Sequence, residues 1–298
     1  TNDALEKKVA ALEGGVGALG VASGHAAQLI AFHTLMEPGC NIVAARKLYG
    51  GSLNQMGEAF LKFGWETRFV DADDPENIRA AMDDKTRCVF IESLANPGGV
   101  VSDISAIADV AHAGGVPLIV DNTMATPALC RPFDFGADIV THSTTKFLNG
   151  HGNAVGGVIV DSGKFDWNNG KFPQITEPSP GYHGLKFSET FGEMAFIIKC
   201  RVEGLRDFGP CMSPFNAFQF LQGIETLGLR MDRHCANAQT VAEHLDKHAL
   251  VTWVQHPGLA SSPYYELGQK YLPKGRGAIF TFGVKGGLEA GKKFIDAL

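Results

Sequence analysis

The sequence predicts an α/β fold in which helices cover a mainly parallel sheet, followed by a smaller C-terminal α/β domain. Short apolar runs alternate with segments of helical periodicity through the first 160 residues. The runs are continuous, as expected of strands buried on both faces. Polar residues follow two of them at the strand end: Asp121 comes directly after 117–120, and Lys146 shortly after 138–141. Alternation of this length is typical of a parallel sheet with crossover helices.

The elements can be placed in order along this first part. The chain opens with a helix in which Leu5, Val9 and Leu12 share one face, and Asp3 with Glu6 forms a candidate capping pair. Strands are predicted at 16–22, 41–45, 67–70, 88–91, 117–120, 138–141 and 156–160. Helices are predicted between them at 26–36, 52–63, 75–82 and 103–113, the third with proline in its first turn.

The rhythm breaks after Asp161. Residues 162–190 contain three prolines and read as a long irregular insertion, a kind of loop that is usually functional. One long helix is expected at 214–248, leading to strands at 252–254 and 278–284. We therefore predict a cofactor-binding domain at 1–227 and a C-terminal domain at 228–298. The second is expected to be truncated, because the helical run 288–298 reaches the last residue without a cap.

Composition excludes some classes of protein. The 298 residues are 45% hydrophobic, enough for a large core, and the net charge of −6 gives no reason to expect nucleic-acid binding. The six cysteines form no C-x-x-C pair and are predicted to be mostly reduced core residues of an intracellular protein. No signal peptide and no apolar run near the roughly 20 residues of a membrane span is present. The predicted location is the cytoplasm, without a membrane partner.

The polar strand ends predict a ligand site. In an open α/β sheet, ligands bind outside the carboxyl ends of the strands, where these side chains would meet. Burying the Asp121 charge after an apolar run costs free energy unless the charge is paired. A cationic pyridine nitrogen is a suitable partner. A helix cap or a salt bridge is the alternative. Lys146, after Ser143 and Thr145, can act as nucleophile and base through a Schiff base, or be a surface lysine.

Three further motifs lie at predicted strand ends. Gly24 and His25 begin a helix, whose N–H groups and dipole favour a phosphate, although an ordinary turn has the same pattern. Tyr49 could stack on a planar ring or pack in the core. Asn96 is held extended before a proline and could face a ring oxygen or build a turn. An acid, phosphate-binding hydroxyls and a reactive amine together are what pyridoxal phosphate requires.

Two other patterns do not predict sites. Gly15–Gly20 matches the dinucleotide fingerprint of an oxidoreductase, but it follows a helix and enters a strand, the reverse of what that motif requires. His142, His151 and Cys130 do not have the spacing of a zinc site, so no metal is expected.

Taken together, the motifs resemble the pyridoxal-phosphate-dependent enzymes of cysteine and methionine metabolism. The resemblance covers nearly the whole chain and rests on the segments Leu-Glu-Gly-Gly (12–15), Ser-Gly-His-Ala-Ala (23–27), Tyr-Gly-Gly (49–51), Glu-Ser-Leu-Ala-Asn-Pro (92–97), Val-Asp-Asn-Thr (120–123) and His-Ser-Thr-Thr-Lys-Phe-Leu-Asn-Gly-His (142–151). Within the family, the insertion with residues 177–184 and the helix that opens at 212–218 resemble the O-acetylhomoserine sulfhydrylases. The resemblance implies fold type I, like that of aspartate aminotransferase.

The resemblance also implies residue roles. Lys146 would carry pyridoxal 5'-phosphate, Asp121 would pair with the pyridine nitrogen, and Tyr49 would stack on the ring and assist proton transfer. The remaining cofactor-binding residues would hold the phosphate (Gly24, His25, Ser143, Thr145) or lie beside the ring (Asn96, Thr123).

The implied reaction is γ-replacement, in which O-acetyl-L-homoserine and sulfide or another thiol give L-homocysteine and acetate in methionine biosynthesis. A γ-lyase acting on methionine or cystathionine is the alternative. Relatives carry a phosphate-binding segment upstream of Thr1 and a substrate-binding arginine beyond Leu298, so the chain is expected to be the ordered part of a longer protein. The expected assembly is a homotetramer of two dimers that share active sites.

Overall fold

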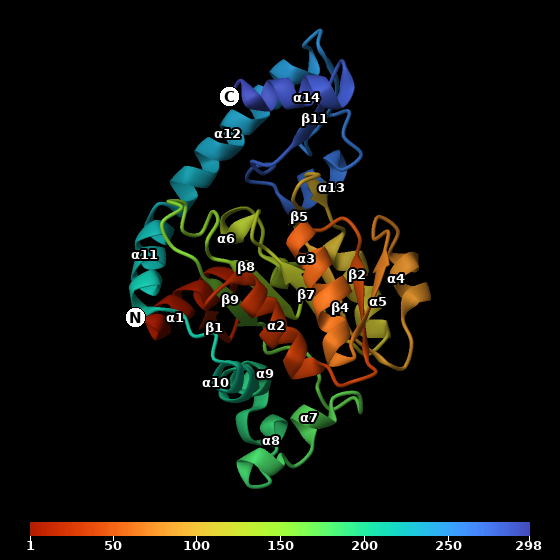
Figure 1. Cartoon of the computed structure of the whole chain (residues 1–298). Coiled ribbons are helices and arrows are strands. Elements are labelled where there is room, and N and C mark those ends of the chain that lie inside the picture. The colour runs from red at the N-terminus through yellow and green to blue at the C-terminus, as the bar shows by residue number, and fades with distance from the viewer.

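A seven-stranded sheet forms the centre of the computed structural model, which describes residues 1–298 (Figure 1). Across the sheet the strand order is β1-β9-β8-β7-β4-β2-β3. The strands are β1 (Gly17–Val21), β2 (Asn41–Ala45), β3 (Glu66–Val70), β4 (Thr86–Glu92), β7 (Leu118–Asp121), β8 (Ile139–Ser143) and β9 (Gly157–Asp161). Only β9 runs against its neighbours, β1 and β8. The predicted α/β class with a mainly parallel sheet is confirmed, and the other six strands end at one edge.

Helices surround this sheet and extend beyond it (Figure 1). They are α1 (Asn2–Glu13), α2 (Gly24–Leu35), α3 (Gly50–Asn54), α4 (Pro75–Ala81), α5 (Ile104–Ala113), α6 (Thr126–Leu129), α7 (Pro173–Thr176), α8 (Phe187–Phe191), α9 (Ala195–Lys199), α10 (Arg206–Phe208), α11 (Pro214–Glu225), α12 (Leu227–Asp246), α13 (Tyr265–Tyr271) and α14 (Gly287–Asp296). The central strands are buried, with Val43, Val89 and Val140 fully inaccessible to solvent. Continuous apolar runs therefore formed strands because both faces of the sheet are covered.

Local signals set several helix starts correctly. The Ser23 hydroxyl accepts a hydrogen bond from the Ala26 N–H at 3.1 Å and so caps α2. Asp74 caps α4, which has proline in its first turn, and Asp103 caps α5. Polar caps satisfy helix N–H groups that have no partner inside the helix.

The predicted cap of the first helix is wrong. Thr1 occupies the cap position, and no side chain caps α1. Glu6 is buried instead: one carboxylate oxygen accepts from the Gly20 N–H at 2.8 Å and the other pairs with Arg201. Leu12, predicted to share the buried face, is 36% exposed. Glu6 therefore binds β1, and its carboxylate is not available to cap α1.

Several longer elements differ from the prediction. The helix expected at 52–63 is α3 followed by a π-helical turn (Gln55–Ala59) and a 3-10 turn (Phe60–Phe63). The helix expected at 214–248 is broken at Thr226 into α11 and α12. The insertion contains α7 and α8 and buries four large apolar side chains. These side chains are Trp167, Phe172, Ile175 and Phe187. Packing against the main core therefore orders a segment that lacks clear periodicity.

A second, two-stranded sheet lies at the far end of α12 (Figure 1). It pairs β10 (Val251–Gln255) with β11 (Thr281–Val284) in antiparallel orientation, and α14 follows. A short hairpin, β5 (Leu94–Ala95) with β6 (Val100–Val101), follows β4. The predicted boundary at 227/228 falls next to the break at Thr226 and stays a prediction.

No helix has the length and apolar character needed to cross a membrane.

Asp161 is the last residue of β9, so it lies at the opposite end of the strands from the carboxyl ends of the other six. Its buried carboxyl gives a testable prediction about stability. Burial raises the pKa of its carboxyl to about 7, although the Gly163 N–H donates to it at 2.9 Å. Since the folded pKa lies above the unfolded one, the group favours folding at low pH, and this contribution is lost as pH rises from about 4 through 7. We expect Asp161→Asn to flatten the pH dependence of the unfolding free energy by at most about 1.4 kcal/mol per pH unit.

Denaturant midpoints at pH 5 and pH 8 measure this effect. The matched control is Asp246→Asn, at an exposed aspartate that makes no hydrogen bond. An Asp161→Asn variant with the same pH dependence as the control would show that the carboxyl is ionised in the folded state.

Candidate active site

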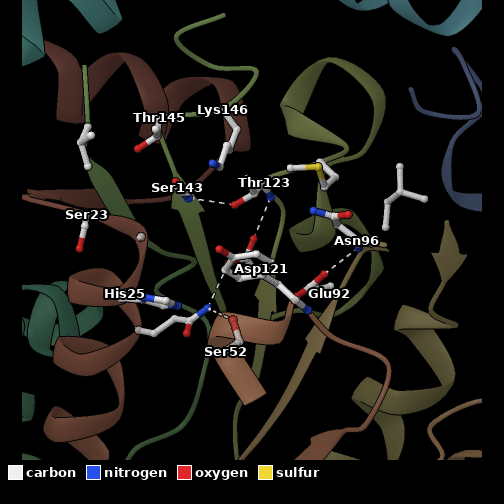
Figure 2. A pocket seen from close by; sticks show the side chains of 16 residues that line it. Ser23, His25, Ser52, Glu92, Asn96, Asp121, Thr123, Ser143, Thr145 and Lys146 are labelled. Carbon is white, nitrogen blue, oxygen red and sulfur yellow. Dashed lines mark hydrogen bonds between the residues drawn. The ribbon is translucent and has the colours of Figure 1, made fainter. Parts of the chain in front are cut away.

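The site is a cavity of about 260 Å³ at the carboxyl ends of the parallel strands (Figure 2). Its wall includes all nine residues that the sequence predicts for the cofactor site. The sixteen lining residues are Ser23, Gly24, His25, Gln28, Tyr49, Ser52, Glu92, Leu94, Asn96, Asp121, Thr123, Met124, Ser143, Thr145, Lys146 and Val155. The parallel strands bring them together because β1, β2, β4, β7 and β8 end at the same edge. The individual roles stay predictions.

Asp121, the last residue of β7, is held from three sides. One carboxylate oxygen accepts from the Thr123 N–H at 2.9 Å. The other accepts from the Gln28 amide at 3.3 Å and the Thr141 hydroxyl at 3.4 Å. No lysine or arginine pairs with it within 4 Å. A partly buried carboxylate that is oriented but has no cation partner can bind a positively charged ligand atom.

Lys146 lies just past β8, and its amine points into the cavity above Asp121 (Figure 2). It is the one lysine in the lining, and its amine makes no hydrogen bond or ion pair. By contrast, Lys47 near the site pairs with Asp71 and Asp73. An amine without a partner in a semi-apolar pocket is available as a nucleophile and base.

The hydroxyl residues on the same side are arranged by the backbone. The Ser143 N–H donates to the Thr123 hydroxyl oxygen at 2.8 Å, which leaves the Thr123 hydroxyl proton free to donate elsewhere. The Thr145 hydroxyl exchanges longer hydrogen bonds with the backbone of Gly156, accepting at 3.1 Å and donating at 3.3 Å. Thr145 therefore lines the cavity while bracing the next strand.

The N-terminus of α2 forms the adjacent wall. The hydroxyl and the carbonyl of Ser23 accept hydrogen bonds from the Ala26 and Ala27 N–H groups. The N–H groups of Gly24 and His25 have no such partner and remain available at the cavity. A Cβ atom at Gly24 would lie 2.8 Å from the Ser143 Cβ, so only glycine permits this approach of helix and strand end. Backbone N–H groups and a helix dipole next to a serine are suited to an anion such as a phosphate.

Tyr49 and His25 form an aromatic pair at the mouth. Their ring centroids are 6.0 Å apart with an interplanar angle of 29°, and Tyr49 is 47% exposed. Gly51 makes room for both, because a Cβ there would come within 3 Å of each ring. The alternative of core packing for Tyr49 is therefore wrong, and the role of His25 stays a prediction.

Sequence reasoning missed Glu92 and Gln28. Glu92 ends β4 as Asp121 ends the neighbouring β7, and the two are paired in register. Gln28 lies one helical turn after Gly24 and is buried, and its amide bridges the Ser52 hydroxyl at 3.0 Å and Asp121. A charge at the end of an apolar strand and a polar residue at i+4 from a ligand-facing glycine were the available signals.

Behind the pocket, His142 and Glu13 form a fully buried pair, with 2.6 Å between the His142 Nε2 and a Glu13 oxygen. The Asn122 amide donates to the same glutamate oxygen at 2.9 Å and to the Cys130 carbonyl. His142 thus braces the strand end that carries Ser143. No group of three His, Cys, Asp or Glu side chains able to hold a metal is present.

The arrangement as a whole can hold a planar cationic ring with a phosphate arm. The carboxylate of Asp121 lies at the base, the anion-binding end of α2 at one side, and the free amine of Lys146 above. Tyr49 lines the cavity and is partly exposed to solvent. This combination supports covalent capture of a carbonyl group and proton transfer next to it.

Comparison with known proteins agrees with this chemistry. The family of Cys/Met metabolism PLP-dependent enzymes matches residues 1–298. An O-acetyl-L-homoserine sulfhydrylase from Leptospira meyeri is 53% identical over all of this chain and 70% of its own length. A homocysteine synthase from Schizosaccharomyces pombe is 50% identical, again over all of this chain and 70% of its own length.

A solved structure from Campylobacter jejuni, assigned as an O-acetylhomoserine (thiol)-lyase, contains a lysine that carries pyridoxyl monophosphate. It superposes with a TM-score of 0.92 at 35% identity, over 95% of this chain and 71% of that one. The predicted family, fold type and cofactor are confirmed. The chain belongs to the pyridoxal-phosphate-dependent enzymes of cysteine and methionine metabolism.

Proposed function

We propose that the chain catalyses γ-replacement, converting O-acetyl-L-homoserine and sulfide into L-homocysteine and acetate in methionine biosynthesis. The single observation that carries the chemistry is the cavity in which the Lys146 amine faces the Asp121 carboxylate beside the N-terminus of α2. The choice of substrate is supported by relatives named O-acetyl-L-homoserine sulfhydrylase and homocysteine synthase that match the whole chain.

The residues present fit pyridoxal phosphate. Asp121 would hold the pyridine nitrogen, since its carboxylate is oriented but lacks a cation. The phosphate would bind where glycine lets α2 approach β8, at Gly24, His25, Ser143 and Thr145. Lys146 would hold the cofactor covalently. Tyr49 would cover the ring face, with Asn96 and Thr123 beside it.

When bound, pyridoxal phosphate withdraws electrons and so acidifies C–H bonds near the substrate amino group. Lys146 would take the proton from Cα of the substrate. A proton also leaves Cβ as the C–O bond at Cγ breaks and acetate departs; sulfide then bonds to Cγ. Lys146 would return protons to Cβ and Cα, which completes L-homocysteine.

The other residues would support these transfers. Thr123, Gln28 and Thr141 donate hydrogen bonds to Asp121 and would keep its carboxylate oriented toward the ring nitrogen. Tyr49 lies where it can exclude water from the ring and assist proton transfer. General acid–base steps of this kind contribute about 10²–10⁴-fold to rate.

Product analysis tests the reaction. Purified protein loaded with cofactor is given O-acetyl-L-homoserine and sulfide, and acetate and homocysteine are quantified together with ammonia and 2-oxoacid. Equal amounts of acetate and homocysteine are expected. In a parallel assay that supplies methionine or cystathionine instead, release of ammonia and 2-oxoacid, together with no replacement in the first assay, would identify the γ-lyase.

We also propose that a second copy of the chain covers the pocket mouth, in a tetramer built from two such dimers. Val155 lines the cavity yet is 55% exposed, and its carbonyl accepts from Asn216 on α11, next to Phe215 (66% exposed) and Phe218 (48% exposed). Apolar surface at the rim of a site is typical of an interface. Sedimentation at falling concentration, monitored at the cofactor's absorption band, tests whether cofactor and partner are lost together.

The cytoplasmic location likewise stays a prediction.

A further inference from the structure

Glu92 is the one acid in the pocket whose pKa is clearly shifted, and the proposed reaction gives it no role. It is the last residue of β4, lines the cavity and is only 5% exposed. No lysine, arginine or histidine pairs with it within 4 Å. A buried carboxyl without a cation is costly unless its oxygens are satisfied in another way.

Both carboxyl oxygens are satisfied by backbone N–H groups. One accepts from the Tyr49 N–H at 2.6 Å, and the other accepts from the Asn96 N–H at 3.2 Å (Figure 2 shows the second). Tyr49 follows β2 and Asn96 follows β5, so a single side chain ties together two loops from different strands. Both loops carry residues predicted to face the cofactor ring.

Asp121 is the charged neighbour of Glu92. The two are register partners on adjacent parallel strands, which lie about 4.8 Å apart. Burial, and then the negative charge of Asp121, raise the pKa of Glu92 to about 8, while the two N–H groups oppose this. The other titratable groups around the cavity are His25 from α2, Tyr49 after β2 and Lys146 after β8. Burial and the neighbouring carboxyl therefore both favour the protonated form of Glu92.

We propose that Glu92 is a positioning residue: it holds Tyr49 and Asn96 against the bound cofactor ring. The inference rests on the proposed placement of the cofactor in this cavity. In this role Glu92 acts through Tyr49 and Asn96, whose N–H groups it binds.

Two substitutions separate these contributions. Glu92→Asp keeps the carboxyl but shortens the side chain by one methylene, so it cannot reach both N–H groups. We expect about 10- to 100-fold lower kcat, with KM changed much less, because displacement by about 1 Å costs this much. The visible circular dichroism of the bound cofactor should fall as well, since it reports the orientation of the ring in the site.

Glu92→Gln keeps the size but cannot ionise. In the wild-type holoenzyme the cofactor's dichroism should depend in part on the ionisation of Glu92, so its pH profile should differ between the wild type and Glu92→Gln. The amide nitrogen would face an N–H donor, so a smaller loss of dichroism is also expected at every pH. The matched control is Glu266→Gln, at an exposed glutamate that makes no hydrogen bond or ion pair.

A third measurement needs no variant. Hydrogen exchange in the wild-type protein should show slow exchange at the Tyr49 and Asn96 amides compared with neighbouring loop amides. Fast exchange there would overturn the proposal even if both variants failed to fold. So would a Glu92→Asp variant with wild-type dichroism and kcat, or a Glu92→Gln variant with the pH profile of the wild type.

These outcomes are separable from failure of the proposed function. Dichroism and exchange require only that the cofactor binds, whatever substrate the enzyme uses. If the wild-type protein binds cofactor with the expected dichroism but makes no homocysteine, the reaction is wrong and Glu92 can still be judged. If it binds no cofactor in this cavity, both proposals fail.

Discussion

Lys146→Ala is expected to abolish covalent attachment of pyridoxal phosphate and to lower turnover by about 10³-fold or more, since one group supplies both nucleophile and base. Lys146 is the one lysine that lines the cavity, and its amine has no competing ion pair. Borohydride reduction of the holoenzyme followed by peptide mapping should place the pyridoxyl group on Lys146. In the alanine variant no lysine should be labelled.

The control for this experiment is Lys164→Ala. Lys164 is exposed, and its side chain makes no hydrogen bond or ion pair. This variant should keep the absorption band and the turnover of the wild type. A pyridoxyl adduct on another lysine, such as the ion-paired Lys47, would refute the assignment of Lys146 and the site built around it.

Asp121→Asn is expected to keep the fold and cripple the chemistry. Asparagine has the same size and still offers an oxygen to the Thr123 N–H, which donates to Asp121 at 2.9 Å. A neutral amide cannot hold the pyridine nitrogen protonated, so the electron-withdrawing power of the cofactor falls. We expect kcat to fall by about 10²-fold or more, a loss of roughly 3 kcal/mol in transition-state stabilisation.

Single-turnover kinetics and the cofactor spectrum check this expectation. Asp109→Asn, at an exposed aspartate on α5, is the control and should behave as the wild type. Unchanged turnover in Asp121→Asn, with an unfolding midpoint equal to that of the wild type, would mean that Asp121 only braces the turn to Thr123.

The sequence predicted the sheet well because its signals are local. The apolar runs are buried strands. Ser23, Asp74 and Asp103 each cap the helix that begins at the next residue. The same local logic failed at Glu6, which was read as half of a capping pair. Its carboxylate binds the Gly20 N–H instead, a contact that exists only once α1 packs against β1.

The candidate site shows the same division. Asp121 and Lys146 could be found from the sequence because parallel strands deliver their carboxyl-end residues to one edge, and all nine predicted residues line one cavity. Glu92 and Gln28 were missed as site residues. Their importance depends on partners far away in sequence, since Glu92 binds the Tyr49 N–H and Gln28 binds Asp121.

By itself, the sequence determined the class of fold, the family and the residues that line the cavity, the predicted reactive lysine and acid among them, because residue type and strand position carry that information. Only the tertiary structure decided how the acid is oriented, which loops one buried carboxyl ties together, and how closely α2 approaches Ser143. These properties depend on distances of a few ångströms between segments up to 119 residues apart, as for Gly24 and Ser143. Burial, charge repulsion and close packing act on those distances, and no local pattern encodes them.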